Sequence, residues 1–121
     1  LEDGKGHPRT SGSYSRVLGH FVRERGILSL MDALRKSSLM PAQRLEHRTP
    51  AMKRKGRVQV GADADLVAFD PDRITDRATY AEPALPPYGM VHVLVNGVPV
   101  VSGGVLQEGA TPGRPVRAPI A

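Results

Sequence analysis

The sequence predicts a small α+β fold in which helices come first and short strands follow. In the first third of the chain, apolar residues recur at spacings of three and four, which is typical of amphipathic helices. In the last third, valines alternate with other residues on either side of an Asn-Gly pair, which is typical of a β-hairpin. The chain has 121 residues, of which 40% are hydrophobic, and this is enough for one small core.

The first helix is expected to follow a polar loop formed by residues 1–12. Ser13 is the predicted N-cap, and Gly26 supplies a left-handed residue just after the helix. The face predicted to pack consists of Tyr14, Val17, Leu18, Phe21 and Val22, and the opposite face consists of Arg16, His20, Arg23 and Glu24.

Two shorter helices are expected next. Ser29 with Asp32 three residues later resembles a capping box, so a second helix is predicted from about Leu30 to Ser37. Pro41 suits the first turn of a third, short helix.

The second half of the chain is expected to contain the strands. Residues 65–70 ("DLVAFD") predict a short buried strand, and residues 71–89 predict an irregular segment because they contain four prolines. Residues 90–109 predict a hairpin with a type I′ turn at Asn96-Gly97, and Pro99 predicts that the returning strand lies at a sheet edge. An extended tail is expected from Ala110 onward.

The composition argues against several classes of site. The chain has no cysteine, which excludes disulfides and thiolate metal sites and favours the reducing cytoplasm. No apolar run approaches the roughly 20 residues that span a bilayer, and no signal peptide is recognisable, so no membrane partner is expected. No zinc site is expected either, because no H-x-H or H-x-x-x-H pair occurs among His7, His20, His47 and His92.

The net charge of +5 raises the question of a polyanionic partner. Only residues 52–57 ("MKRKGR") are densely basic, and no aromatic residues are interleaved with them to stack on bases. The segment is therefore expected to be a solvated connector, and nucleic acid is not an expected partner. A basic interaction module that uses Lys53 to Arg57 stays open as a non-enzymatic alternative.

Two stretches in the second half resemble the end of the amidohydrolase superfamily. They are "GRVQVGADADLVAFD" (residues 56–70) and the hairpin "HVLVNGVPVVSGG" (residues 92–104). The resemblance implies strands of a small β-sandwich that does no chemistry, beside a TIM barrel. It implies that residues 1–47 are the loop and helices from the end of the barrel, and that residues 48–121 are the connector, sandwich strands and tail.

The first half resembles one branch of that superfamily, the N-acyl-D-amino-acid deacylases or D-aminoacylases. The similar stretches are "GHPRTSGSYSRVLGHFVRE" (residues 6–24) and "LSLMDALRKSSLMPAQRL" (residues 28–45). The resemblance implies that Arg9 binds the substrate carboxylate through two parallel hydrogen bonds and that His7 helps to position this loop. The alternatives are an ion pair between Arg9 and a neighbouring acid, and a purely structural hydrogen bond for His7. Tyr14 is expected to pack rather than react.

No catalytic residue is assigned securely. The family carries a catalytic Asp-Gly after the last barrel strand, and Asp3-Gly4 matches it in composition. However, the spacing from Asp3 to Arg9 is short and no apolar strand precedes it. Asp3 is therefore expected to be a loop residue, with the catalytic Asp-Gly upstream of Leu1.

The chain is thus expected to be the C-terminal part of a zinc-dependent N-acyl-D-amino-acid deacylase. Zinc would belong to the parent enzyme, and this fragment alone would bind none and be inactive. The expected partners are a small N-acyl-D-amino acid and the remainder of the parent chain, or a second copy, because the strands would present unpaired edges. The alternative enzyme is a cyclic-amide hydrolase of the dihydroorotase or hydantoinase type, which the His-Pro-Arg stretch does not resemble.

Overall fold

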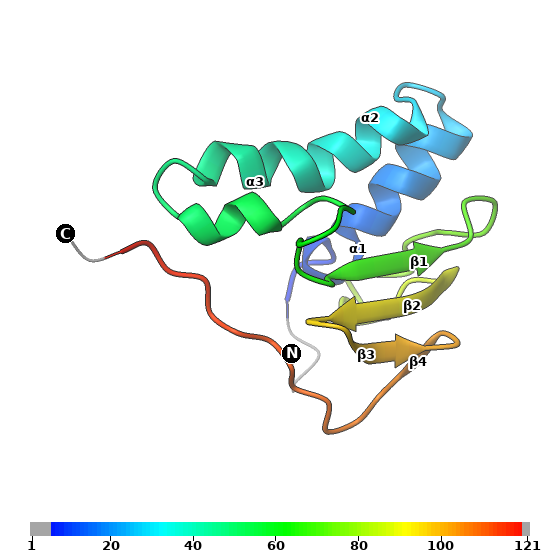
Figure 1. Cartoon of the computed structure of the whole chain (residues 1–121). Helices are drawn as coiled ribbons and strands as arrows, with labels where there is room; N and C mark the ends of the chain where they lie inside the picture. Colours follow the sequence, from blue (N-terminus) through cyan, green and yellow to red (C-terminus); the bar gives the residue numbers. More distant parts are fainter. Residues whose placement is uncertain (1–5, 120–121) are drawn as a thin grey trace. The chain divides into compact units, whose positions relative to one another are not determined.

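The computed structural model describes residues 6–119, and its elements follow the predicted order of helices and then strands (Figure 1). The chain divides into two compact units that interleave along the sequence. Unit 1 comprises Leu1–Ala33 and Phe69–Val91, and unit 2 comprises Leu34–Ala68 and His92–Ala121. Within residues 6–119, no helix is both long and apolar enough to cross a lipid bilayer.

In unit 1 the first helix begins earlier than predicted. Helix α1 (Arg9–Arg16) follows Pro8, whose ring holds φ at −51°, and it continues into a π-helical segment, η1 (Val17–Glu24). Ser13 is not the N-cap, because its hydroxyl donates to the Arg9 carbonyl at 2.6 Å inside the helix. The prediction of a loop up to residue 12 is wrong from Arg9 onward, because the Gly12 N–H already donates to the Pro8 carbonyl at 2.9 Å in the first helical turn. The end is as predicted, with Gly26 at φ +59°.

The face of this helix that packs is only partly the predicted one, because Val17, Leu18 and Val22 are half-buried but no large apolar residue of the helix is fully buried. The buried residues are Gly12, Ser15 and Gly19, whereas Tyr14 is 69% exposed. Their small side chains allow close approach of the segment that we call loop 71–89. A Cβ on Gly19 would lie only 2.5 Å from the Ile74 carbonyl oxygen, and Ile74 itself is fully buried. Packing of Tyr14 was therefore a wrong prediction, because backbone proximity selects small residues here rather than large apolar ones.

Two arginines assigned to the opposite face connect the helix to loop 71–89. Arg23 Nη1 donates to the carbonyls of Ile74 at 2.6 Å and Pro71 at 3.2 Å. Arg16 forms an ion pair with Asp76 at 3.3 Å. The loop is irregular, as predicted, and its one bridge pairs Thr75 with Tyr88.

The second predicted helix starts where expected. Helix α2 (Leu30–Leu34) is preceded by Ser29, whose hydroxyl oxygen accepts the Asp32 N–H at 3.1 Å and donates to the Asp32 carboxylate at 2.7 Å. The predicted break before Pro41 is absent, because the π-helical segment η2 (Arg35–Leu39) leads directly into α3 (Met40–Leu45). A π-helical turn is a known way for a helix to accommodate a local irregularity such as a proline.

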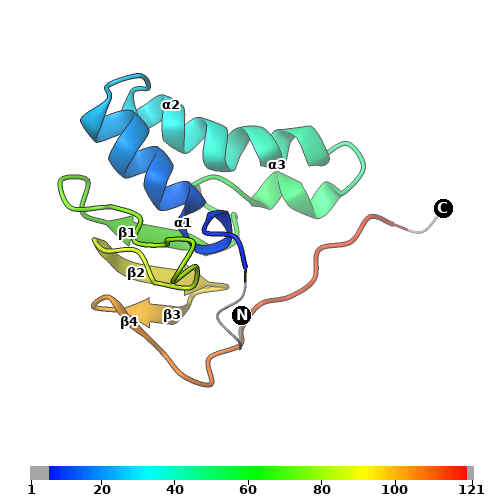
Figure 2. The same ribbon diagram turned by 180° about the vertical axis from the view of Figure 1, so that it is seen from behind.

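The four strands form one sheet in the order β1-β2-β3-β4, and most of it belongs to unit 2 (Figure 2). Their bounds are β1 (Leu66–Phe69), β2 (Met90–Val95), β3 (Val98–Ser102) and β4 (Val105–Leu106). Strands β2 and β3 form the predicted antiparallel hairpin. Asn96 and Gly97 both have positive φ, +49° and +78°, as a type I′ turn requires.

Two predictions about the strands need correction. Strand β1 lies at an edge of the sheet, and its Val67 is 56% exposed, so β1 is not buried. Strand β3 is not an edge strand, because β4 pairs with its residues Val101 and Ser102. Pro99 is tolerated because β4 does not extend to it. Pro99 pairs with Leu94 of β2, and the register of the hairpin shifts between Val93 and Leu94.

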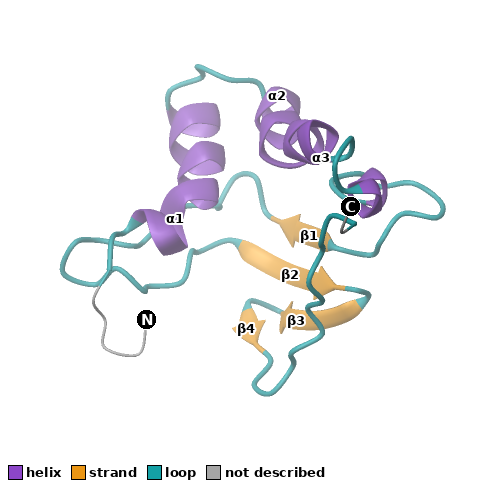
Figure 3. Cartoon of the chain, turned by 90° about the vertical axis from the view of Figure 1, so that its left-hand side faces the viewer, coloured by secondary structure: helices purple, strands orange, loops and turns teal. Residues whose placement is uncertain are grey.

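The remaining segments carry little regular structure. Residues 48–64 contain one short 3₁₀ helix, η3 (Pro50–Arg54), and residues 110–119 have neither helix nor strand, as coloured in Figure 3. The tail is attached to the hairpin turn by Asn96 Nδ2, which donates to the Pro112 carbonyl at 2.7 Å.

Candidate functional site

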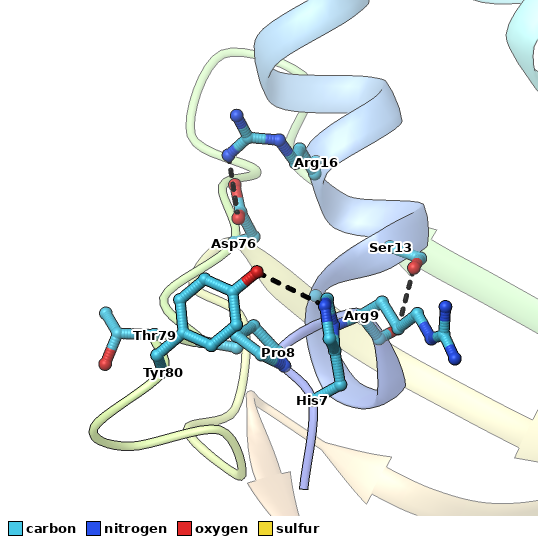
Figure 4. Close-up of a pocket in the computed structure, with 10 residues that line it drawn as sticks. His7, Pro8, Arg9, Ser13, Arg16, Asp76, Thr79 and Tyr80 are labelled. Atoms are coloured by element: carbon cyan, nitrogen blue, oxygen red, sulfur yellow. Dashed lines mark hydrogen bonds and ion pairs between the residues drawn. The ribbon is translucent and has the colours of Figure 1, made fainter.

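The start of α1 and loop 71–89 border a pocket of about 410 Å³ that lies wholly within unit 1 (Figure 4). Both residues of the predicted substrate site, His7 and Arg9, are among its lining residues. The others are Pro8, Gly12, Ser13, Arg16, Asp76, Ala78, Thr79 and Tyr80. The pocket therefore joins the His-Pro-Arg stretch to a segment about 70 residues away, which sequence patterns did not connect to it.

His7 completes the start of α1. The first N–H groups of a helix have no partner within the helix. The His7 carbonyl accepts the Thr10 N–H at 3.0 Å, and the His7 Nδ1 accepts the Arg9 N–H at 3.1 Å. A histidine one residue before the proline thus satisfies two of the helix's unpaired donors, and this explains its place in the stretch.

The same contacts define the hydrogen positions on the His7 ring. Because Nδ1 accepts a hydrogen bond from a backbone N–H, the neutral ring carries its hydrogen on Nε2. Nε2 lies 3.3 Å from the Tyr80 hydroxyl, to which it donates. The two rings meet edge to face, with centroids 5.2 Å apart.

Arg9 lies at the first position of α1, and its side chain is exposed. Figure 4 shows the guanidinium extending away from Tyr80 and Asp76. Among the ion pairs formed by residues 6–119, none includes Arg9, whereas Arg16 at the same pocket is paired with Asp76. The described residues thus leave the guanidinium available for a carboxylate.

The other candidates do not join this site. Asp3 lies outside the described residues. His20 Nδ1 donates to the Glu24 carboxylate at 2.9 Å, and this hydrogen bond lowers the pKa of Glu24. Residues 6–119 contain no group of three or more His, Asp or Glu side chains placed to hold a metal ion.

The basic run is largely neutralised within unit 2. Lys55 Nζ lies 3.0 Å from Asp63 and 2.5 Å from Asp65, Arg54 pairs with Asp63, and Arg57 pairs with Glu46. The hydrogen bond to Asp65 raises the pKa of Lys55. A binding surface for polyanions needs unpaired cations, so these pairs favour the connector over the interaction module.

Comparison with known proteins links the chain to one family. The model of the amidohydrolase family matches residues 5–101. An N-acyl-D-glutamate deacylase from Alcaligenes xylosoxydans xylosoxydans is 46% identical over 98 residues, which are 81% of this chain and 19% of that protein. A D-aminoacylase from the same organism is 39% identical over 98 residues, with the same coverage. The chain thus spans about a fifth of the length of these relatives.

Solved structures show the same relationship. The N-acyl-D-glutamate deacylase of Bordetella bronchiseptica, complexed with zinc and a phosphonate inhibitor, is 44% identical with a TM-score of 0.71, over 78% of this chain and 19% of that one. A D-aminoacylase described as having a binuclear metal centre is 35% identical with a TM-score of 0.76, over 84% of this chain and 20% of that one. The predicted resemblance and the α+β architecture are confirmed. The chain belongs to the amidohydrolase family.

Proposed function

We propose that this chain is the C-terminal part of a zinc-dependent N-acyl-D-amino-acid deacylase in the cytoplasm. The observation that carries the proposal is that the similar proteins are an N-acyl-D-glutamate deacylase and a D-aminoacylase, and that the family match over residues 5–101 includes the His-Pro-Arg stretch of this chain. The reaction is hydrolysis of the amide bond, which releases a carboxylate and a free D-amino acid. The small-molecule partner is accordingly an N-acyl-D-amino acid.

In the proposed parent enzyme, residues 1–47 are the loop and helices at the end of a TIM barrel. Residues 48–121 are the connector, the strands of a small β-sandwich and the tail. The exposed edges β1 and β4 support this placement, because both could pair with strands from the remainder of the parent chain.

The zinc of the proposed enzyme polarises the acyl carbonyl and activates water when it is bound. Because residues 6–119 hold no suitable group of ligands, we place the metal ligands outside this range. The role of the described residues is to anchor the substrate carboxylate and to supply structural packing.

Arg9 is the residue we assign to the substrate carboxylate. Its backbone is held by His7 Nδ1 at the first position of α1, while its guanidinium takes part in no ion pair of the described residues. A planar guanidinium binds a carboxylate through two parallel, charge-assisted hydrogen bonds, which fix both the position and the orientation of the substrate. This orientation would present the acyl group to the reaction centre in one way only.

The proposal is tested with the full-length, zinc-loaded enzyme and matched N-acetyl-D- and N-acetyl-L-amino acids. We expect hydrolysis of the D series and a fall of about 10- to 100-fold in kcat/KM for Arg9→Ala, because a charge-assisted pair is lost. Arg9→Lys should recover only part of this loss, since an ammonium cannot form the bidentate pair. Arg25→Ala is the matched control, because Arg25 is exposed on the same unit and takes part in no ion pair of the described residues.

Two results would contradict the proposal. Activity confined to cyclic amides would make the enzyme a hydrolase of the dihydroorotase or hydantoinase type. Hydrolysis of the D series that Arg9→Ala leaves unchanged would remove the carboxylate role of Arg9.

A further inference from the structure

Tyr80 lines the candidate site from loop 71–89. The turn that contains Tyr80 is closed by hydrogen bonds between the residues on either side of it. The Thr79 N–H donates to the Glu82 carbonyl at 3.1 Å, and the Glu82 N–H donates to the Thr79 hydroxyl at 3.0 Å. Pro83, directly after this turn, is one of the largest fully buried side chains. The turn therefore presents Tyr80 at a defined place beside His7.

His7 lies between Tyr80 and Arg9. The Tyr80 hydroxyl accepts from His7 Nε2 at 3.3 Å, and His7 Nδ1 accepts the Arg9 N–H at 3.1 Å. The Arg9 N–H selects the tautomer, and the Tyr80 hydroxyl, as the second partner, holds the orientation of the ring. Without the Tyr80 hydroxyl, the ring could rotate and leave the Arg9 N–H unpaired.

We propose that Tyr80 is a positioning residue for the substrate carboxylate, which acts through His7 on the placement of Arg9. This inference rests on the proposed function, because it gives Arg9 the carboxylate role. It extends the site to a residue that lies 73 positions from His7 in the sequence.

The exposure of Tyr80 makes the inference testable. Its side chain is 80% exposed, so the ring buries little apolar surface, and replacing it by phenylalanine changes little packing. Tyr80→Phe keeps the edge-to-face contact and removes only the hydroxyl. An effect of this substitution on substrate binding therefore reports on the hydrogen bond rather than on folding.

The experiment compares four forms of the full-length enzyme: wild type, Arg9→Ala, Tyr80→Phe and the double variant. Each is assayed with an N-acetyl-D-amino acid and with its primary carboxamide, which lacks the carboxylate. For Tyr80→Phe we expect KM for the acid to rise about 2- to 5-fold, the effect of one hydrogen bond, with kcat and the carboxamide KM unchanged. In the Arg9→Ala background Tyr80→Phe should have no further effect. Tyr14→Phe is the matched control, because Tyr14 is similarly exposed on α1.

The outcomes separate this inference from the proposed function. If Arg9→Ala raises KM for the acid and Tyr80→Phe does not, the positioning role of Tyr80 is overturned while the proposed function stands. If the two substitutions act independently, the coupling through His7 is overturned. If Arg9→Ala leaves KM for the acid unchanged, the carboxylate role of Arg9 fails and this inference fails with it, whereas the deacylase function itself fails only if the wild type does not hydrolyse the D series.

Discussion

At the scale of single residues, the chain relies on side chains that satisfy backbone groups. His7 pairs with the first N–H of α1, Arg23 with two carbonyls of loop 71–89, and Asp65 with the N–H of Asn96 at 2.8 Å. Each contact joins residues whose backbone groups would otherwise lack a partner. The polar residues of this sequence therefore determine where its elements start and turn.

Asp65 gives the clearest pH dependence at this scale. Its hydrogen bond with Lys55, and then that with the Asn96 N–H, lowers the pKa of Asp65 below its ordinary value of 3.8. A depressed pKa in the folded state stabilises the fold above the ordinary value, and this contribution is lost as the pH falls through the lowered value. The pKa of Lys55 is raised above its ordinary value of 10.5, so Lys55 stabilises the fold below pH 10.5. This contribution is lost as the pH rises through the raised pKa.

We therefore predict that Asp65→Asn destabilises the full-length enzyme by about 0.5–1 kcal/mol at neutral pH, because Lys55 loses one of its two carboxylate partners at a site that is partly open to solvent. The difference from wild type should shrink on acidification, since wild-type Asp65 then becomes protonated. Urea midpoints at neutral and acidic pH measure this. Asp72→Asn is the control, because Asp72 is exposed and in no ion pair of the described residues. An equal effect of both substitutions at every pH would refute the role of the pair.

The residue scale also shows what the sequence could and could not predict about the site. His7 and Arg9 were identified from one contiguous stretch, and both line the pocket. Tyr80 and Asp76 were missed, because they lie in a proline-rich segment whose only signal is irregularity. Contacts between residues so distant in sequence depend on how the loop folds back, and local patterns carry no information about that.

At the scale of elements, local signals were reliable where the backbone itself imposes a residue type. The Asn-Gly turn, the glycine after η1 and the Ser29 cap all occur as predicted. The start of α1 differs from the prediction, and the helix face is predicted only in part, because its fully buried residues are those that contact loop 71–89. Small residues at 12, 15 and 19 match no apolar stripe, although they form the face that the loop covers.

Gly19 tests this interpretation of the helix face. Replacing a helical glycine by alanine ordinarily stabilises a helix by about 1 kcal/mol. Here the added Cβ would lie 2.5 Å from the Ile74 carbonyl oxygen and 3.3 Å from the Thr75 Cα, both backbone atoms. We therefore expect Gly19→Ala to destabilise the full-length enzyme by about 1–3 kcal/mol, as overpacking does.

Urea midpoints measure this change in stability. Gly113→Ala is the control, because a Cβ on Gly113 would have no atom within 4 Å. A stabilised Gly19→Ala variant would show that the loop does not press on the helix.

At the scale of the whole molecule, the sheet has more apolar surface than this chain covers. The edge strands β1 and β4 expose Val67 by 56% and Val105 by 65%. Exposed apolar edge strands offer unpaired N–H and C=O groups to any further strand. In the proposed parent enzyme, the remainder of the parent chain would supply such strands. A single copy of the 121-residue chain leaves both edges unpaired.

We therefore predict that the 121-residue chain, prepared alone, forms oligomers whose size grows with concentration, because copies pair through these edges. Lysine substitutions at Val67 and Val105 should reduce this association, since a charge on an edge strand opposes pairing. The matched control carries the same two charges outside the strands, at Val58 and Val60, which are the most exposed large apolar residues. Light scattering after size exclusion measures the mass at each concentration. A wild-type chain that stays monomeric throughout, or a control as effective as the edge variant, would show that the sheet edges do not drive association.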